Sequence, residues 1–206
     1  MDPPFGITLA ILAGGRSERM GQDKALMLFL GRPLILRICE RLKPLADEVI
    51  VTTSHPEDYA FLGVPCYPDF EPGRGALGGL YTALSMASNP IVAAVGCDLP
   101  FASLGIFRYA CDLMREGDFD VVVPSTDKGL EPLHAVYRRE ACLPVIRRAM
   151  DKDDLKLINW FAEAKTIKLK PQETAKLDQQ GLGFWNLNTP EDFQQAEERA
   201  RREEMR

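Results

Sequence analysis

Short apolar runs alternate along this chain with longer segments in which apolar residues recur at helical spacing. Several runs lack the polar alternation of a half-exposed strand, which is typical of strands covered on both faces. The expected strands are 6–12, 48–53, 91–97, 119–124 and 133–138. The expected helices begin at Pro33 or cover 77–88, 103–115 and 140–150. This alternation predicts an α/β fold, a three-layer α/β/α domain with a mostly parallel, Rossmann-like sheet.

The last part of the chain is expected to continue in the same way. We interpret "FWNLN" at 184–188 as a strand end, followed by a helix that Thr189 caps with Asp192 three residues further on. Residues 150–182 have the weakest pattern: "TIKLK" is compatible with a strand, whereas "PQETAKLDQQG" is interpreted as a loop. Because no linker or repeat divides the chain, we expect a single domain over 1–206.

Composition and charge restrict the classes of partner. The chain is 46% hydrophobic and 27% charged, with a net charge of −5 and a pI near 5.2. Binders of nucleic acid or anionic membranes need a basic surface, so neither partner is expected. The five cysteines are scattered and form no CxxC pair, and there are two histidines. We therefore expect a cytoplasmic protein with reduced thiols and no zinc site.

The loop after the first expected strand, "LAGGRSERMGQDKAL" at 12–26, combines glycines with positive charge. Ligands of open parallel sheets bind at the carboxyl ends of the strands. There Gly14 and Gly15 would let the backbone approach a ligand closely, and Arg16, Arg19 and Lys24 would supply charge for a polyphosphate. The loop matches neither the Walker motif nor G-x-G-x-x-G. A solvated surface loop is the alternative interpretation.

Two further segments are expected at the same edge of the sheet. In "PGRGALGGL" (72–80), Gly78 and Gly79 fall at the expected start of a helix, where free N–H groups bind anions, although tight helix packing explains them equally well. In "GCDLP", Asp98 directly follows a strand, and its carboxylate suits Mg²⁺. Asp98 could instead cap the helix near 103, but Ser103 can take that role. Asp69 is a weaker acidic candidate. Together these segments predict a nucleotide–metal site.

These motifs, with "NLNTPEDF" near the end, resemble the molybdenum cofactor guanylyltransferases of the MobA type, which are nucleotidyltransferases with a glycosyltransferase-A-like fold. The resemblance runs from residue 7 to about 138 and resumes at 185–193. It implies Mg²⁺-dependent transfer of GMP from GTP to molybdenum-bound molybdopterin, with release of pyrophosphate. It also implies a nucleotide-binding half at about 1–100, an acceptor-binding half at about 101–206, and contact with cofactor-delivery or acceptor molybdoenzyme proteins.

The resemblance assigns roles residue by residue. The catalytic residues would be Arg19, Lys24 and Asp98, with Asp98 as the Mg²⁺ ligand. Residues expected to contact the nucleotide are Leu12, Ala13, Gly14, Gly15, Lys24, Thr52, Asp69, Gly78 and Gly79. Asn186 and Asn188 would lie near the pterin end. The chain departs from the family at Thr52, where Asn is common, at Ala76, where Pro is usual, and in 150–165, where Lys156 stands in place of several basic residues. His134 is expected to be structural.

Two other functions stay open from the sequence. A sister nucleotidyltransferase could use CTP or another acceptor, because the choice of base depends on few residues. A nucleotide-binding regulatory protein without catalysis is the other alternative. The presence of both Lys24 and Asp98 disfavours it, since a binding module has little need for a metal at the α-phosphate.

Overall fold

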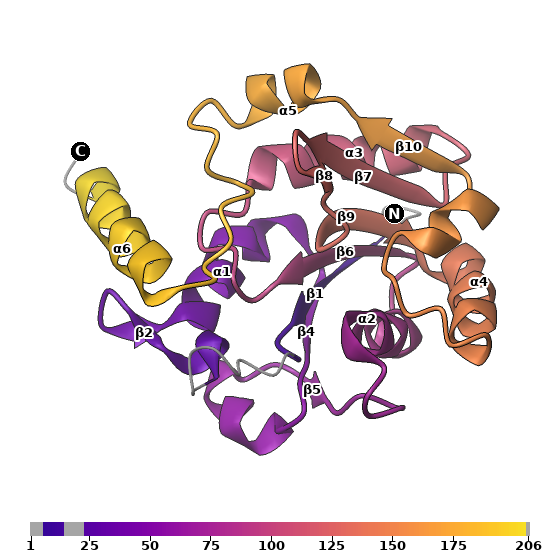
Figure 1. Ribbon diagram of the computed structural model, residues 1–206, viewed down its shortest axis with the longest axis horizontal. Helices are drawn as coiled ribbons and strands as arrows, with labels where there is room; N and C mark the ends of the chain where they lie inside the picture. The colour runs from indigo at the N-terminus through magenta and orange to yellow at the C-terminus, as the bar shows by residue number, and fades with distance from the viewer. Residues whose placement is uncertain (1–5, 15–22, 205–206) are drawn as a thin grey trace.

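One mixed sheet runs through the middle of the chain's computed structural model, which describes residues 6–14 and 23–204 (Figure 1). The strands are β1 (Ile7–Leu12), β2 (Leu28–Phe29), β3 (Arg32–Pro33), β4 (Glu48–Thr52), β5 (Cys66–Tyr67), β6 (Ile91–Gly96), β7 (Val121–Thr126), β8 (Gly129–Leu130), β9 (His134–Arg138) and β10 (Thr166–Leu169). The helices are α1 (Leu34–Leu42), α2 (Gly75–Met86), α3 (Leu104–Glu116), α4 (Arg139–Asp151), α5 (Pro171–Leu177) and α6 (Pro190–Glu204). Short 3-10 helices cover Lys24–Leu26, Lys43–Leu45, Pro56–Leu62 and Asn159–Glu163.

The strand order of the sheet is β10-β7-β9-β6-β1-β4-β5, and β8 pairs with β7. β9 runs antiparallel to its neighbours β6 and β7, whereas β1 is parallel to both β4 and β6. The chain leaves β1 toward β4 on one side and later returns to β6 on the other. The order therefore reverses between β1 and β6, and such a switch point is where open α/β sheets bind ligands.

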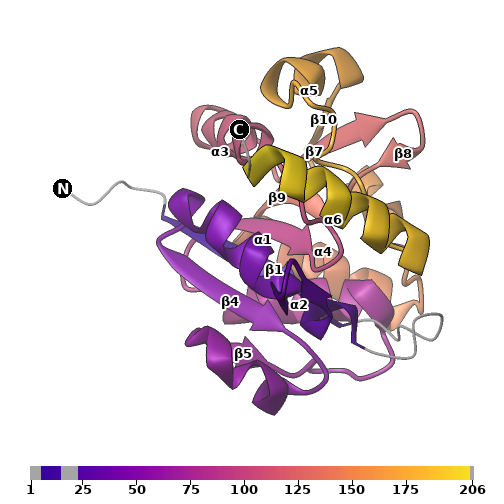
Figure 2. The same ribbon diagram turned by 90° about the vertical axis from the view of Figure 1, so that its left-hand side faces the viewer.

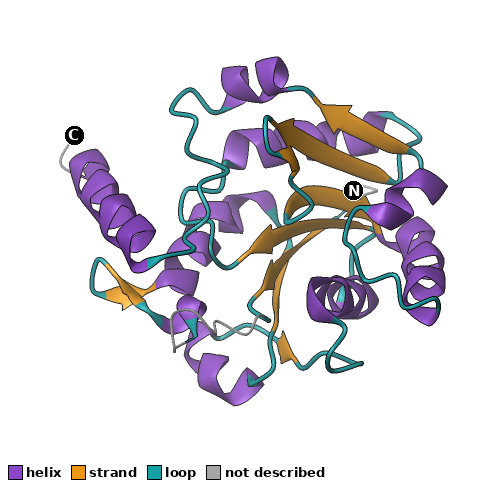
Figure 3. Ribbon diagram, viewed as in Figure 1, coloured by secondary structure: helices purple, strands orange, loops and turns teal. Residues whose placement is uncertain are grey.

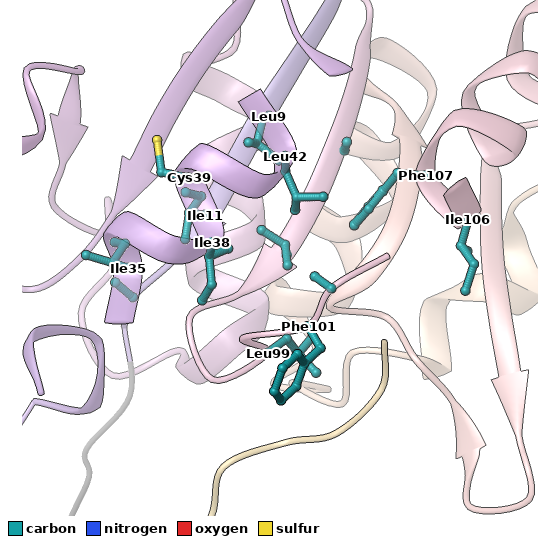
Figure 4. Close-up of a cluster of buried hydrophobic side chains, with 14 of the residues drawn as sticks. Leu9, Ile11, Ile35, Ile38, Cys39, Leu42, Leu99, Phe101, Ile106 and Phe107 are labelled. Atoms are coloured by element: carbon teal, nitrogen blue, oxygen red, sulfur yellow. The ribbon is translucent and has the colours of Figure 1, made fainter. Parts of the chain in front are cut away.

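Helices cover both faces of the sheet and create two buried cores (Figure 3). On one face, Leu9 and Ile11 of β1 lie beside Ile38 of α1 (Figure 4). On the other face, α2, α4 and the 3-10 helix Asn159–Glu163 pack against the sheet. α6 lies at the left-hand edge of the molecule in Figure 1 and crosses the front of the view in Figure 2. Its Phe193 meets Phe29 of β2 with ring centroids 5.5 Å apart. The predicted α/β/α layering is confirmed.

The helix caps that the sequence predicts at Ser103 and Thr189 are confirmed. The Ser103 hydroxyl accepts a hydrogen bond from the Ile106 N–H at 3.3 Å and caps α3. At the start of α6, the Asp192 N–H donates to the Thr189 hydroxyl and the Thr189 N–H donates to the Asp192 carboxylate, both at 3.0 Å. This is the reciprocal capping box that the sequence predicts. The strand predicted at "TIKLK" is β10.

Two predictions for the second half of the chain are wrong. Residues 184–188 form no strand, because their aromatic rings pack instead: Trp185 stacks on Phe101 and Phe184 meets the His134 ring edge-on. The segment "PQETAKL" is helix α5, not a loop. Its start is closed by the Glu173 carboxylate, which accepts from the Lys170 N–H at 2.8 Å.

All five cysteines are free thiols, with no disulfide among them. Within 6–14 and 23–204, no helix has the length and apolar character needed to cross a membrane.

His134 is part of the core between β9 and α3. Its side chain is 1% exposed, its ring stacks on Phe107 at 4.2 Å, and its Nε2 atom accepts a hydrogen bond from the Ser103 N–H at 2.9 Å. Burial lowers the pKa of His134 to about 4, because a buried imidazolium has lost its hydration. The histidine therefore has the structural role that the sequence predicts.

This burial predicts a loss of stability in mild acid. Between pH 6.5 and about 4, His134 is mostly protonated in the unfolded chain and mostly neutral in the folded chain. The free energy of unfolding therefore falls as the pH falls. From pH 7 to pH 5 we expect His134 to contribute a loss of ~2 kcal/mol. Urea unfolding at the two pH values measures it. The variant His134→Gln should lose less on acidification, whereas His55→Gln, at an exposed histidine, should behave like the unmodified chain.

Candidate active site

The carboxyl ends of β1, β4 and β6 meet at the switch point of the sheet. Leu12 is in register with Thr52 on one side and with Gly96 on the other. Beyond the strands, the Ala13 N–H donates to the Thr52 carbonyl at 2.8 Å and the Cys97 N–H donates to the Leu12 carbonyl at 3.1 Å. The sheet thus continues to the point where the first loop leaves β1. Leu12, Ala13, Thr52 and the residues after Gly96 are held together by backbone hydrogen bonds.

Asp98 projects from the end of β6, as the sequence predicts. A Cβ atom at Gly96 would lie 2.8 Å from the Asp98 Oδ1 atom, so this carboxylate requires a glycine two residues before it. Burial raises the pKa of the Asp98 carboxyl, while the charge of Lys24 acts in the opposite direction. Because Ser103 caps α3, Asp98 is not committed to that role. Its partly buried charge is instead available to a cation.

Lys24 comes from the short helix after the first loop, and its side chain extends toward Asp98. Its Nζ atom donates to the Asn188 Oδ1 atom at 3.3 Å across 164 positions of sequence. The segment carrying Asn188 is tied to the strand end, because the Leu187 N–H donates to the Asp98 carbonyl at 3.0 Å. Asn186 lies in this same segment. Lys24, Asp98 and Asn188, predicted from three distant motifs, are therefore brought together.

Two residues that the sequence analysis missed hold Lys24 in place. The Asp23 carboxylate accepts from the Ala25 N–H at 3.0 Å and from the Tyr59 hydroxyl at 2.6 Å. Tyr59 is fully buried, and burial together with Asp23 raises the pKa of its phenol. Asp23 stands at the cap of Lys24–Leu26, which is a local signal in the sequence. Tyr59 is 36 positions away, and no local signal identifies it.

A second group of residues, which we call the Gly79 cluster, comprises Leu12, Thr52, Asp69 and Gly79. A Cβ atom at Gly79 would lie 3.4 Å from Leu12 and 3.6 Å from both Asp69 Oδ1 and Thr52 Oγ1. These last two oxygens are buried, and neither has a hydrogen-bond partner among the described residues. Burial also raises the pKa of the Asp69 carboxyl. Unpaired buried polar atoms are costly, so this cluster is suited to a ligand that supplies the missing hydrogen bonds.

The neighbouring glycines differ in what they face. Gly14 adjoins the Gly79 cluster, since its Cβ atom would lie 3.7 Å from Asp69 Oδ2. A Cβ atom at Gly78 would instead lie 2.7 Å from the Arg74 Cβ atom, so the packing interpretation applies to Gly78. The expected helix start is also corrected, because α2 begins at Gly75. Gly15 and Arg19, also predicted at the site, lie outside the described residues.

The carboxylates at this edge of the sheet suit one way in which proteins bind Mg²⁺. The described part of the chain has no group of three or more His, Cys, Asp or Glu that could hold a metal. Mg²⁺ commonly takes only one or two protein carboxylates and completes its shell with phosphate oxygens and water. Asp98, a partly buried carboxylate close to one lysine, fits that mode of binding.

This arrangement defines a class of protein. A strand-end carboxylate, a lysine and a glycine-lined cluster with unpaired polar atoms lie together at the switch point of a mostly parallel sheet, where such folds bind ligands, and these are the groups that a nucleotidyltransferase needs. Residues 9–167 match the family described as the MobA-like NTP transferase domain. The match covers most of the chain, and the chain belongs to this family.

Relatives agree with this assignment. The chain is 34% identical over 188 residues to a probable molybdenum cofactor guanylyltransferase of Carboxydothermus hydrogenoformans, covering 91% of this chain and 93% of the relative. A molybdenum cofactor guanylyltransferase of Desulfosudis oleivorans is 31% identical, with 96% of each chain covered. The solved structure of molybdopterin-guanine dinucleotide biosynthesis protein A from Archaeoglobus fulgidus has the same fold, with a TM-score of 0.82, 23% identity, and coverage of 95% of this chain and 99% of that one.

Proposed function

We propose that this chain is a molybdenum cofactor guanylyltransferase, which transfers GMP from GTP to molybdenum-bound molybdopterin and releases pyrophosphate. The observation that carries the proposal is the convergence of Lys24, Asp98 and Asn188 beside the Gly79 cluster, in a chain that belongs to the MobA-like family. Leu12 joins the two groups, because its side chain belongs to the cluster and its carbonyl accepts from Cys97, next to Asp98.

The chemistry requires positioning and charge neutralisation more than proton transfer. A terminal phosphate oxygen of the pterin attacks the α-phosphorus of GTP, and the bond from that phosphorus to the bridging oxygen of pyrophosphate breaks. Lys24 would neutralise charge on the phosphates as pyrophosphate leaves, with Arg19 assigned to the same task. Mg²⁺, when bound, would polarise the α-phosphate, and Asp98 is the residue that would hold it. Asn186 and Asn188 are assigned to the acceptor side.

The Gly79 cluster favours guanine over cytosine. Guanine presents two adjacent donors, the N1–H and the 2-amino group, to which a carboxylate can bind in a bidentate way. Cytosine presents one amino donor next to an acceptor. The unpaired Asp69 carboxylate oxygen is therefore better satisfied by guanine, and Thr52 adds a hydroxyl within reach of the same position. Fold alone does not decide the base, since a 4-diphosphocytidyl-2C-methyl-D-erythritol synthase from Anaerococcus prevotii shares this fold with a TM-score of 0.67.

We place the reaction in the cytoplasm, because five free cysteines suit a reducing compartment. We also propose, as partners, proteins that deliver the cofactor or accept the finished dinucleotide.

Measuring pyrophosphate release with each of the four nucleoside triphosphates, in the presence of Mg²⁺ and molybdenum-bound molybdopterin, tests the proposal. We expect release with GTP and not with CTP, ATP or UTP, and none when Mg²⁺ is chelated. Release with CTP alone would overturn the choice of base while leaving the transfer chemistry in place. No release with any nucleotide, together with tight GTP binding, would indicate a regulatory nucleotide-binding protein.

A further inference from the structure

A network of charged side chains joins the loop before α2 to the end of α4, outside the residues assigned to catalysis. Arg147 of α4 donates to Glu71 of the loop and pairs with Asp151 at 2.7 Å. The second oxygen of Glu71 accepts from Arg74 at 3.3 Å, and Arg74 also pairs with Asp153 at 2.7 Å. α2 and α4 lie side by side on one face of the sheet (Figure 1). The network therefore fixes the loop 71–74 to the end of a neighbouring helix.

The chemistry of Arg147 is suited to this role. Its guanidinium also lies over the Tyr81 ring of α2, 5.6 Å from the ring centroid, so one side chain contacts both the loop and the helix that follows the loop. The pKa of the Glu71 carboxyl is lowered, mainly because Arg147 donates to it. A planar guanidinium can serve two carboxylates and a ring at once, which a lysine cannot.

The same loop carries the predicted base-reading residue. Asp69 precedes Glu71 by two positions, and Phe70 between them is tied to α2 by its N–H, which donates to the Thr82 hydroxyl at 3.0 Å. On the other side of Glu71, Arg74 packs so closely against Gly78 that no larger residue fits there. The loop is thus held on α2 at both ends, while Glu71 is held from α4. The position of Asp69 relative to Gly79 depends on all three attachments.

We infer that Arg147 is a positioning residue for base recognition: through Glu71 it holds the loop so that the Asp69 carboxylate faces the base of the nucleotide. The inference rests on the proposed function and deepens it. Within the described part of the chain, Arg147 pairs with Glu71 and Asp151 and forms no hydrogen bond or ion pair with Lys24 or Asp98. Loss of Arg147 should therefore weaken the discrimination between bases, whereas the rate of transfer from bound nucleotide should stay close to normal.

The test uses GTP and inosine triphosphate, which lacks the 2-amino group of guanine. The purified full chain should bind GTP more tightly than ITP in a calorimetric titration. The variant R147M should bind GTP about 3- to 10-fold more weakly, the range expected for losing a small ionic network. The ratio of its Kd for ITP to its Kd for GTP should fall toward one. Its KM for GTP should rise, while kcat at saturating GTP stays within about twofold of the unmodified chain.

The chain offers a matched control and two supporting variants. Arg148, the next residue of α4, pairs with Glu163 at 3.0 Å and takes no part in the network, so R148M should bind and discriminate normally. E71Q should reproduce R147M, and the double variant should lose little more than either single one, because both remove the same contact. R147K should recover part of the loss, because a lysine still pairs with Glu71.

The outcomes separate the inference from the function. R147M with unchanged GTP affinity and an unchanged GTP-to-ITP ratio would overturn the inference and leave the function standing. Equal losses for GTP and ITP accompanied by a lower Tm would show a purely structural role, and would overturn it too. A chain that prefers GTP through Arg147 yet transfers no GMP would overturn the function and leave the positioning role intact.

Discussion

Asp98→Asn is expected to lower turnover by about a thousandfold or more. The substitution keeps the size of the side chain and removes the charge that would hold Mg²⁺ at the end of β6. Losing the metal removes charge stabilisation of several kcal/mol from the transition state, and ~4 kcal/mol corresponds to a factor of about 10³ in rate. Pyrophosphate release under saturating GTP and Mg²⁺ measures the effect.

The fold should tolerate this change. Burial already disfavours the charged form of Asp98, and the residue caps no helix, so the asparagine variant should keep the Tm of the unmodified chain. Asp112→Asn is the matched control, since Asp112 is an exposed carboxylate on α3 that pairs with Arg115 at 3.5 Å. Near-normal turnover in Asp98→Asn, with Mg²⁺ still required, would remove Asp98 from the mechanism.

Lys24→Met is the second large effect that we expect. The methionine keeps the apolar stem and deletes the ammonium, so a charge-assisted contact to the phosphates is lost at a cost of ~1.5–3 kcal/mol. In kcat/KM this is a loss of roughly 10- to 100-fold, which steady-state kinetics with varied GTP would detect. The effect should appear in GTP affinity as well, because Lys24 is assigned to bound phosphate in both the ground state and the transition state.

Lys43→Met provides the comparison, since Lys43 is exposed at the C-terminal cap of α1 and has no role assigned to it at the site. Lys24→Arg keeps the charge and should recover part of the activity. If Lys24→Met retained full GTP affinity and normal kinetics while Lys43→Met did so as well, the phosphate-binding role of Lys24 would be lost.

The parts of the fold that were predictable have their causes in nearby residues. The unbroken apolar runs of β1 and β6 fit a strand covered on both faces, and both are fully buried. The caps at Ser103 and Thr189 are made within three or four residues of sequence. Helix α5 has helical start signals, namely Pro171 in the first turn and Glu173 two residues later, but its residues are mostly polar, so no apolar periodicity marks it as a helix.

The candidate site divides in the same way. The types of residue that could carry the chemistry, such as Lys24 in a glycine-rich loop and Asp98 after a strand, stand out in the sequence because their neighbours are unusual. The contacts that fix them do not: the Tyr59 hydroxyl reaches Asp23, and Arg147 reaches Glu71 across 76 positions. Gly78 and Gly79 are identical neighbours in the sequence, and only packing shows that Gly78 faces Arg74 whereas Gly79 faces Leu12, Thr52 and Asp69.

By itself, the sequence determined the layered α/β fold, the strands that end at the site, and the side chains able to bind phosphate and metal, because strand patterns, caps and loop chemistry are properties of adjacent residues. The tertiary structure alone decided that β9 runs antiparallel, that the order of strands reverses between β1 and β6, and that Lys24, Asp98 and Asn188 share one place. Those outcomes depend on how distant segments bury their apolar faces against one another, and no short stretch of sequence contains that information.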